Sequence, residues 1–108
     1  MGYTMLNRYK DRLKEIKDGK NLILDSGVST ELERRGAPMK NSHWSGRVSI
    51  DSYQILVDTH KAYIDSGADI ITVNSYASSR LVLGDSENAP LIERINKNNI
   101  EAALEARE

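Results

Sequence analysis

The chain has 108 residues and a mass of 12.1 kDa, which is the usual size of one small domain. Fifteen basic side chains nearly balance sixteen acidic ones, so the charge gives no reason to expect binding to nucleic acid or to an anionic membrane. There is no cysteine, which excludes disulfides and thiol chemistry from these residues, and no apolar run has the length of a membrane span. We therefore expect a soluble protein of the reducing cytoplasm.

The first third of the chain predicts one helix and one strand. Apolar side chains recur at helical spacing within Leu6–Lys17, and Asp18 with Gly19 ends the pattern. The run Leu22–Leu24 is short and uniformly apolar, which is typical of a strand covered on both faces. Residues 26–50 are expected to be mostly loop, with a helical turn over Thr30–Arg35 that Gly36 and Pro38 end.

The remainder predicts a helix, a strand and a final helix. Residues 52–66 form one apolar helix face, and Gly67 supplies a left-handed cap. The β-branched run Ile70–Val73 predicts a second buried strand. After a polar loop, a last helix is expected to begin near Pro90. The apolar face of the 52–66 helix comprises Tyr53, Leu56, Val57, His60, Tyr63 and Ile64, and that of the last helix comprises Leu91, Ile92, Ile95, Ile100, Ala103 and Leu104.

A strand, a helix and a second buried strand predict a parallel pair with a right-handed crossover. Two such strands would leave open apolar edges, so we expect residues 1–108 to be one segment of a larger α/β sheet.

Binding groups in parallel α/β folds gather where strands end at their carboxyl side. This rule selects two groups of residues as a candidate binding rim: Asp25, Ser26 and Gly27 after the first strand, and Asn74, Ser75 and Tyr76 after the second. Asp25 has two interpretations that the pattern leaves equal. It either caps the following helical turn or binds a ligand amino group, with the small residues beside it leaving room for a ligand carboxylate.

Aromatic and histidine residues also allow more than one role. Trp44 either plugs its own loop or forms, with Tyr76, an aromatic wall for a cationic group. His60 lies on an apolar helix face and is interpreted as a buried, hydrogen-bonded histidine rather than a catalyst, while His43 has no evident partner. Neither histidine has a second ligand at metal-binding spacing, so no metal site is predicted.

Several ordered blocks resemble one family. The stretches LILDSGVSTELERRG, HWSGRVSID and VDTHKAYIDSGADIITVNSYASS resemble the opening of the homocysteine S-methyltransferases, over about residues 20–108. The resemblance implies the amino-terminal part of a (β/α)8 TIM barrel, namely a preceding helix and the first two strand-helix units. It also implies transfer of a methyl group from S-methylmethionine, S-adenosylmethionine or betaine to zinc-activated homocysteine, giving methionine.

The same resemblance assigns roles to individual residues. Asp25 and Gly27 match the family's acidic glycine turn, which holds the amino-acid end of homocysteine, and Thr30 with Glu31 matches the Thr-Glu pair after it. Ser26 stands where a first glycine is usual, and Ser29 where Gly or Ala is usual.

Further along the chain, Asn74 falls at the polar position ending the second strand. Trp44 and Tyr76 match aromatic residues of the methyl-donor region. The implied substrate-binding residues are therefore Asp25, Ser26, Gly27, Thr30, Glu31 and Asn74, and the implied donor-binding residues are Trp44 and Tyr76.

The family's zinc ligands are cysteines of later strands, so this chain alone is expected to bind no zinc and to be inactive. Its expected partners are homocysteine, a methyl donor, and either the remainder of the barrel or further copies of the chain. The alternative is a truncated, non-catalytic α/β module that oligomerises or binds an amino acid.

Overall fold

The computed structural model describes residues 5–38, 47–75 and 89–108. These residues form helices α1 (Met5–Lys17), α2 (Val28–Arg34), α3 (Val48–Asp51), α4 (Tyr53–Asp65) and α6 (Ile92–Arg107), with a short 3₁₀ helix, η2 (Ala89–Leu91), directly before α6. No helix in the described ranges is both long and apolar enough to cross a membrane.

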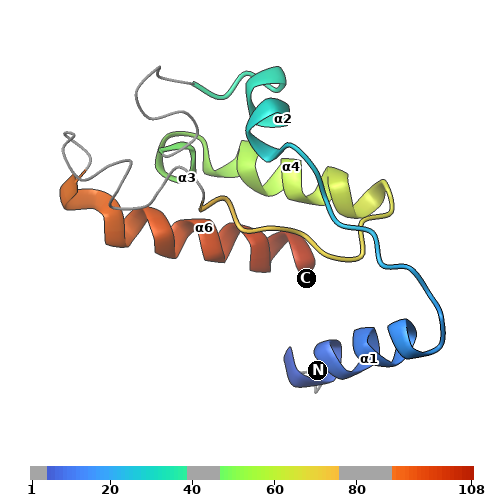
Figure 1. The fold of residues 1–108 in the computed structure, drawn as a ribbon. Helices are drawn as coiled ribbons and strands as arrows, with labels where there is room; N and C mark the ends of the chain where they lie inside the picture. The colour runs from blue at the N-terminus through green and yellow to red at the C-terminus, as the bar shows by residue number, and fades with distance from the viewer. Residues whose placement is uncertain (1–4, 39–46, 76–88) are drawn as a thin grey trace.

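The core lies between α4 and α6, which run side by side, while α2 packs on α4 and α3 contacts both long helices (Figure 1). Leu56 and Val57 of α4 are fully buried, and so is Ala102 of α6. Burial of these apolar side chains removes them from water and stabilises the helix pair. The predicted apolar face of α4 is confirmed, with Gly67 at φ +110° after its end.

Two extended segments connect the helices, and they meet side by side in parallel. Leu24 and Ile70 form a single parallel bridge, in which the N–H of Asp25 donates to the carbonyl of Ile70 at 3.0 Å. One residue earlier, the N–H of Asp69 donates to the carbonyl of Ile23 at 2.8 Å. The parallel direction of the pair is thus confirmed, although within the described residues the pairing does not extend into a strand ladder.

The prediction that both segments are buried on both faces is wrong for the described structure. Leu24 is 63% exposed, Ile23 57% and Ile70 39%. Within the described ranges no apolar layer covers these three side chains, as it would in a strand buried on both faces.

Helix α1 forms where its periodicity predicts, but its apolar face is not buried. Tyr9, Leu13 and Ile16 remain exposed, and α1 (blue in Figure 1) lies apart from α2 and α4. Gly19, at φ +92°, follows its end as expected. Periodicity therefore predicted the helix correctly, while burial of its apolar stripe depends on what packs against it.

The segment 26–50 contains more helix than predicted. Its described part includes α2, followed by Gly36 at φ +91°, and also α3, most of which lies within the range predicted to be loop. Ser52 separates α3 from α4 because its backbone, at φ −147° and ψ 52°, is not helical. The Ser49 hydroxyl of α3 donates to the carbonyl of Ile95 at 3.1 Å, so tertiary contact supports this four-residue helix.

Candidate functional site

Asp25 ends the first extended segment, and both oxygens of its carboxylate contact Thr72 on the second. Oδ2 accepts the Thr72 backbone N–H at 2.8 Å, and Oδ1 accepts the Thr72 hydroxyl at 2.8 Å. These bonds fix the half-buried carboxylate across the pair of parallel segments. The capping interpretation finds no support, since the N-cap residue of α2 is Gly27 and no side-chain cap hydrogen bond is present there.

The Asp25 carboxylate keeps capacity for a ligand. An ionised carboxylate has about four acceptor positions, and Thr72 uses two of them. A ligand ammonium could therefore bind the remaining positions through charge-assisted hydrogen bonds without displacing Thr72. Thr72 was missed as a site residue, although it is the only polar side chain in the run Ile70–Val73.

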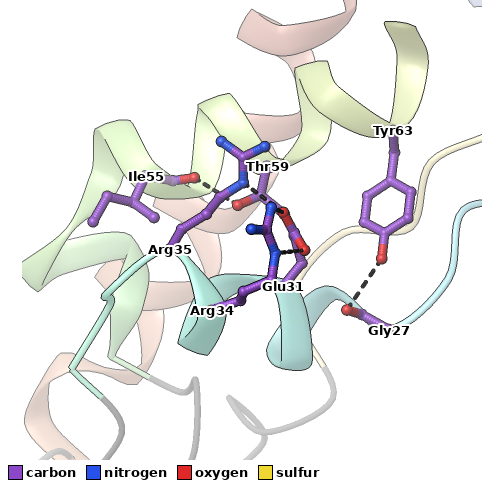
Figure 2. A network of polar contacts seen from close by, with 7 residues as sticks. All are labelled: Gly27, Glu31, Arg34, Arg35, Ile55, Thr59 and Tyr63. Atoms are coloured by element: carbon purple, nitrogen blue, oxygen red, sulfur yellow. Dashed lines mark hydrogen bonds and ion pairs between the residues drawn. The ribbon is translucent and has the colours of Figure 1, made fainter. Parts of the chain in front are cut away.

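The turn after Asp25 is tied to α4. The carbonyl of Gly27 accepts the Tyr63 hydroxyl at 3.2 Å and the Glu31 backbone N–H at 3.1 Å (Figure 2). Gly27 has φ −54°, and a Cβ built there would lie 3.4 Å from Thr30 Oγ1, an ordinary contact. Ser26 is exposed beside it. The structure therefore places Ser26, Gly27 and Thr30 around one turn next to Asp25.

Glu31 projects from α2 and is bound by two arginines. Its carboxylate accepts hydrogen bonds from Arg34 Nε at 2.7 Å and from Arg35 Nε at 2.8 Å (Figure 2). The hydrogen bonds from Arg34, and then those from Arg35, lower the pKa of Glu31 to about 2. Glu31 is thus an ionised acid whose carboxylate is bound by the two arginines that follow it in the chain.

Asn74 and His60 are both buried near the paired segments. Asn74 lies two residues beyond Thr72 and is 7% exposed. His60, on α4, is 0% exposed, and within the described residues neither ring nitrogen has a hydrogen-bond partner. The prediction of a buried histidine is confirmed, but the prediction that it is hydrogen-bonded is wrong for this part of the chain. Burial lowers the pKa of His60, and the negative charge of Asp25 partly opposes that shift.

The comparison with known families adds a decisive observation. The family model described as homocysteine S-methyltransferase matches residues 22–108, which include the whole of the candidate rim. The chain belongs to the homocysteine S-methyltransferase family. The family resemblance seen in the sequence is therefore confirmed.

Similar proteins of this family occur in plants and bacteria. A selenocysteine Se-methyltransferase of Brassica oleracea is 35% identical over 91% of the chain and 28% of its own length. Homocysteine S-methyltransferase 2 of Arabidopsis thaliana is 33% identical over 94% of the chain and 30% of its own length. The homocysteine S-methyltransferase YbgG of Bacillus subtilis is 33% identical over 54% of the chain and 18% of its own length. The chain thus spans less than a third of each of these relatives, and no solved structure matches it.

Some residues that the family resemblance selects lie outside the described ranges. Trp44 and Tyr76, the expected donor-binding pair, belong to these, as does His43. Their roles stay predictions. The described residues therefore include the expected substrate-binding positions but neither of the expected donor-binding positions.

The zinc that the family's chemistry implies does not fit the residues of this chain. Thiolate ligands are absent because the sequence contains no cysteine. Across the described ranges, no three side chains of His, Asp or Glu come close enough together to hold a metal ion. We therefore derive no step of the reaction through a metal held by these residues.

A cleft of about 630 Å³ lies away from the candidate rim, between α1, the second extended segment and the end of α6. Its lining is mainly apolar and includes Tyr9, Ile70 and Leu104; the charged residues Arg8, Arg12, Asp69 and Arg107 also line it. Asp25, Thr72 and Asn74 do not line it. Its volume would suit a small ligand, but the polar groups suited to an amino acid are at the rim.

Proposed function

We propose that this chain forms the substrate-binding start of a homocysteine S-methyltransferase, with Asp25 as the group that binds the homocysteine ammonium. The observation that carries this proposal is the Asp25 carboxylate, which Thr72 holds at the end of two parallel segments while acceptor positions remain for a ligand. Family membership and the relatives' names supply the substrate class.

The proposed cradle has a role for each neighbouring group. The ammonium of the amino acid would bind Asp25, and the turn formed by Ser26 and Gly27 would lie beside the ligand's carboxylate. Thr30 and Asn74 would border the same space, and Glu31 would act indirectly by fixing α2 through its arginines. These roles are supported by the placement of the described residues around one turn and one strand end.

In the complete protein, the proposed reaction transfers a methyl group to the homocysteine sulfur. The thiol releases its proton to water, the sulfur forms a bond to the methyl carbon, and the bond between that carbon and the cationic donor breaks with its electron pair staying on the donor. The products are methionine and a neutral donor remnant. Zinc would activate the thiol when bound by cysteines elsewhere in such an enzyme. Trp44 and Tyr76 are proposed to face the donor, whether it is a sulfonium or a quaternary ammonium.

We further propose that the segment belongs to a (β/α)8 barrel. Support comes from the parallel pairing of Leu24 with Ile70 and from the exposed apolar side chains on these segments. Further parallel strands would cover that surface. On this proposal the chain alone is inactive, because it lacks the thiolate ligands for zinc.

Calorimetric titration of the purified chain with L-homocysteine tests the binding proposal. The wild type should bind, and Asp25→Asn should weaken the affinity at least tenfold, as roughly expected for loss of a charged hydrogen bond. Asp65→Asn, an exposed acid at the end of α4, is the matched control and should bind like the wild type. No binding by the wild type, or equal binding by Asp25→Asn, would contradict the proposal.

A second candidate function is an oligomerising module without catalysis. The observation that favours it is the open apolar surface of Ile23, Leu24 and Ile70. Light scattering distinguishes the candidates: a stable dimer or larger assembly without homocysteine binding supports this module. Methionine formation by the chain from homocysteine and S-methylmethionine would contradict both this module and the expected inactivity.

A further inference from the structure

The Thr72 hydroxyl makes a hydrogen bond whose direction is fixed by the chemistry of its partner. Oγ1 of Thr72 lies 2.8 Å from Oδ1 of Asp25. A carboxylate accepts hydrogen bonds and cannot donate them, so the single proton of the hydroxyl is used in this bond. The two lone pairs of Oγ1 stay available to other donors. Toward a ligand, the Thr72 hydroxyl therefore acts as an acceptor.

The backbone of the paired segments fixes the position of this hydroxyl. The N–H of Thr72 donates to Oδ2 of Asp25 at 2.8 Å, so one residue binds both carboxylate oxygens. The carbonyl of Ile70 accepts the N–H of Asp25 at 3.0 Å, which holds the same two segments together. Threonine is also branched at Cβ, and this restricts its χ1 rotamers. The relative placement of Oγ1 and the carboxylate is thus built into the parallel pair.

Both side chains are accessible at the rim. Thr72 is exposed and Asp25 is half-buried in the described structure. Because Oγ1 and Oδ1 are in hydrogen-bond contact, a ligand group that reaches the carboxylate also comes close to the lone pairs of Oγ1. Asp25 and Thr72 together are called the acceptor pair below, since each offers a ligand acceptor positions from a different segment.

The acceptor pair suits a ligand group that donates several hydrogen bonds. A primary ammonium has three N–H donors and no lone pair. It can therefore donate to Asp25 and to Thr72 at the same time. A hydroxyl has one proton and can donate to only one of the two residues, and a carboxylate would be repelled by the charge of Asp25.

We propose that Thr72 is a substrate-binding residue, which accepts a hydrogen bond from the ligand ammonium through Oγ1 and makes the site select α-amino acids over their α-hydroxy analogues. This role rests on the proposed function, in which Asp25 binds the same ammonium. The first extended segment then supplies the charge that attracts the ligand, and the second supplies a neutral acceptor that distinguishes an ammonium from a hydroxyl.

NMR titrations of the purified chain with two ligands test the selectivity. The ligands are L-homocysteine and its α-hydroxy analogue, in which a hydroxyl replaces the amino group. Thr72→Val should weaken homocysteine binding by about tenfold, the effect of one hydrogen bond to a charged group. It should change the binding of the analogue little, because the single hydroxyl proton of the analogue is donated to Asp25. The preference for homocysteine should therefore fall about tenfold, and an unchanged preference would overturn the proposal.

Two further variants at the same position serve as controls. Thr72→Ser keeps the hydroxyl and should keep the wild-type preference. Thr72→Ala removes the hydroxyl without an added methyl group, so it should lose the preference as Thr72→Val does. A smaller fraction of folded protein would weaken the apparent binding of both ligands by the same factor. The preference therefore reports on ligand contact rather than on stability.

A double variant separates contact with the ligand from positioning of Asp25. If Thr72 acted only by orienting the carboxylate, its replacement by Val would have no further effect in Asp25→Asn, which lacks that carboxylate. Direct contact predicts that Asp25→Asn with Thr72→Val binds homocysteine severalfold more weakly than Asp25→Asn alone. Equal binding by these two variants would overturn the proposal.

The same titrations distinguish failure of this inference from failure of the proposed function. A wild-type chain that binds no homocysteine, or that Asp25→Asn leaves unaffected, would contradict the proposed function and this role with it. Binding that Asp25→Asn weakens, together with an unchanged preference in Thr72→Val, would contradict the role of Thr72 alone.

Discussion

The hydroxyl of Tyr63 donates to the carbonyl oxygen of Gly27 across 3.2 Å, which joins the last turn of α4 to the turn beside Asp25. Helix and rim are thereby fixed to each other by one side chain. The turn has no side-chain cap of its own at the start of α2, so this bond is a main constraint on it.

Replacing Tyr63 by Phe should loosen that turn. The change keeps the ring and removes only the hydroxyl, so the free energy of unfolding should fall by about 0.5–1.5 kcal/mol, the usual net worth of one hydrogen bond. Hydrogen exchange should become faster in the amides of residues 26–31. Exchange at wild-type rates in that segment would show that other contacts fix the turn.

Replacing Thr72 by Val should free one oxygen of the Asp25 carboxylate. The backbone N–H of Thr72 remains, so only the bond at Oδ1 is lost, and the unfolding free energy should fall by about 1 kcal/mol. Thr72→Ser keeps the hydroxyl and serves as the control. Urea denaturation of both variants checks this: Thr72→Ser should unfold at nearly the wild-type midpoint, and a Thr72→Val midpoint equal to that of the wild type would contradict the contribution of the hydroxyl.

Substitution by alanine should affect stability differently at Gly67 and at Gly27. Gly67 has φ +110°, where a side chain is strained although nothing lies within 4 Å of an added Cβ, so Gly67→Ala should cost about 1 kcal/mol of stability. Gly27 has φ −54°, and its added Cβ makes only ordinary contact, so Gly27→Ala should be nearly neutral. Thermal unfolding of the two variants should show the larger decrease for Gly67→Ala, and the reverse order would contradict both backbone assignments.

Acidification should destabilise the fold over the pH range in which His60 binds a proton more readily in the unfolded chain than in the folded one. Its pKa is lowered in the folded state, mainly by burial, so the unfolded chain binds a proton more readily as the pH falls below about 6.5. Stability should therefore decline from that pH down to the folded-state pKa. Denaturant midpoints at pH 7.5, 6.5 and 5.5 should decrease in the wild type and stay nearly constant in His60→Leu; parallel decreases would assign the effect to another group.

Stability should also depend on pH in a more acidic range because of Glu31. Arg34 and Arg35 lower the pKa of Glu31 from 4.5 to about 2. The contribution of the ionised Glu31 to the free energy of unfolding is present above pH 4.5 and is lost as the pH falls toward 2. Because the group is exposed, salt should screen the effect and Glu31→Gln should change stability only slightly. Denaturant midpoints at low and high NaCl check this against Glu33→Gln as the control, and a large salt-independent loss would contradict it.

Local sequence was a sufficient guide to the long helices and to the glycines that follow helix ends. The spacing in residues 6–17 and 52–66 predicted α1 and α4, and Gly19, Gly36 and Gly67 follow helix ends with positive φ, as their chemistry favours. Helix α3 was missed because four residues give no periodicity, and its contact with Ile95 comes from a distant part of the chain.

The candidate site was predictable only in part. Asp25 and Asn74 could be selected because a short apolar run ends at each of them, and parallel strand ends are where ligands bind. Thr72 and Tyr63 could not, since their roles depend on partners 47 and 36 residues away along the chain. A pattern of residue types does not give such pairings.

The sequence by itself determined the long helices α1, α4 and α6, the parallel direction of the two extended segments and the family to which the chain belongs, because each depends on local periodicity or on residue order. The tertiary structure decided that Asp25 binds Thr72 rather than capping α2, that His60 is buried without a partner in the described residues, and that Leu24 and Ile70 are exposed. Burial and pairing depend on which elements pack against each other, and that is a property of the assembled chain rather than of any stretch within it.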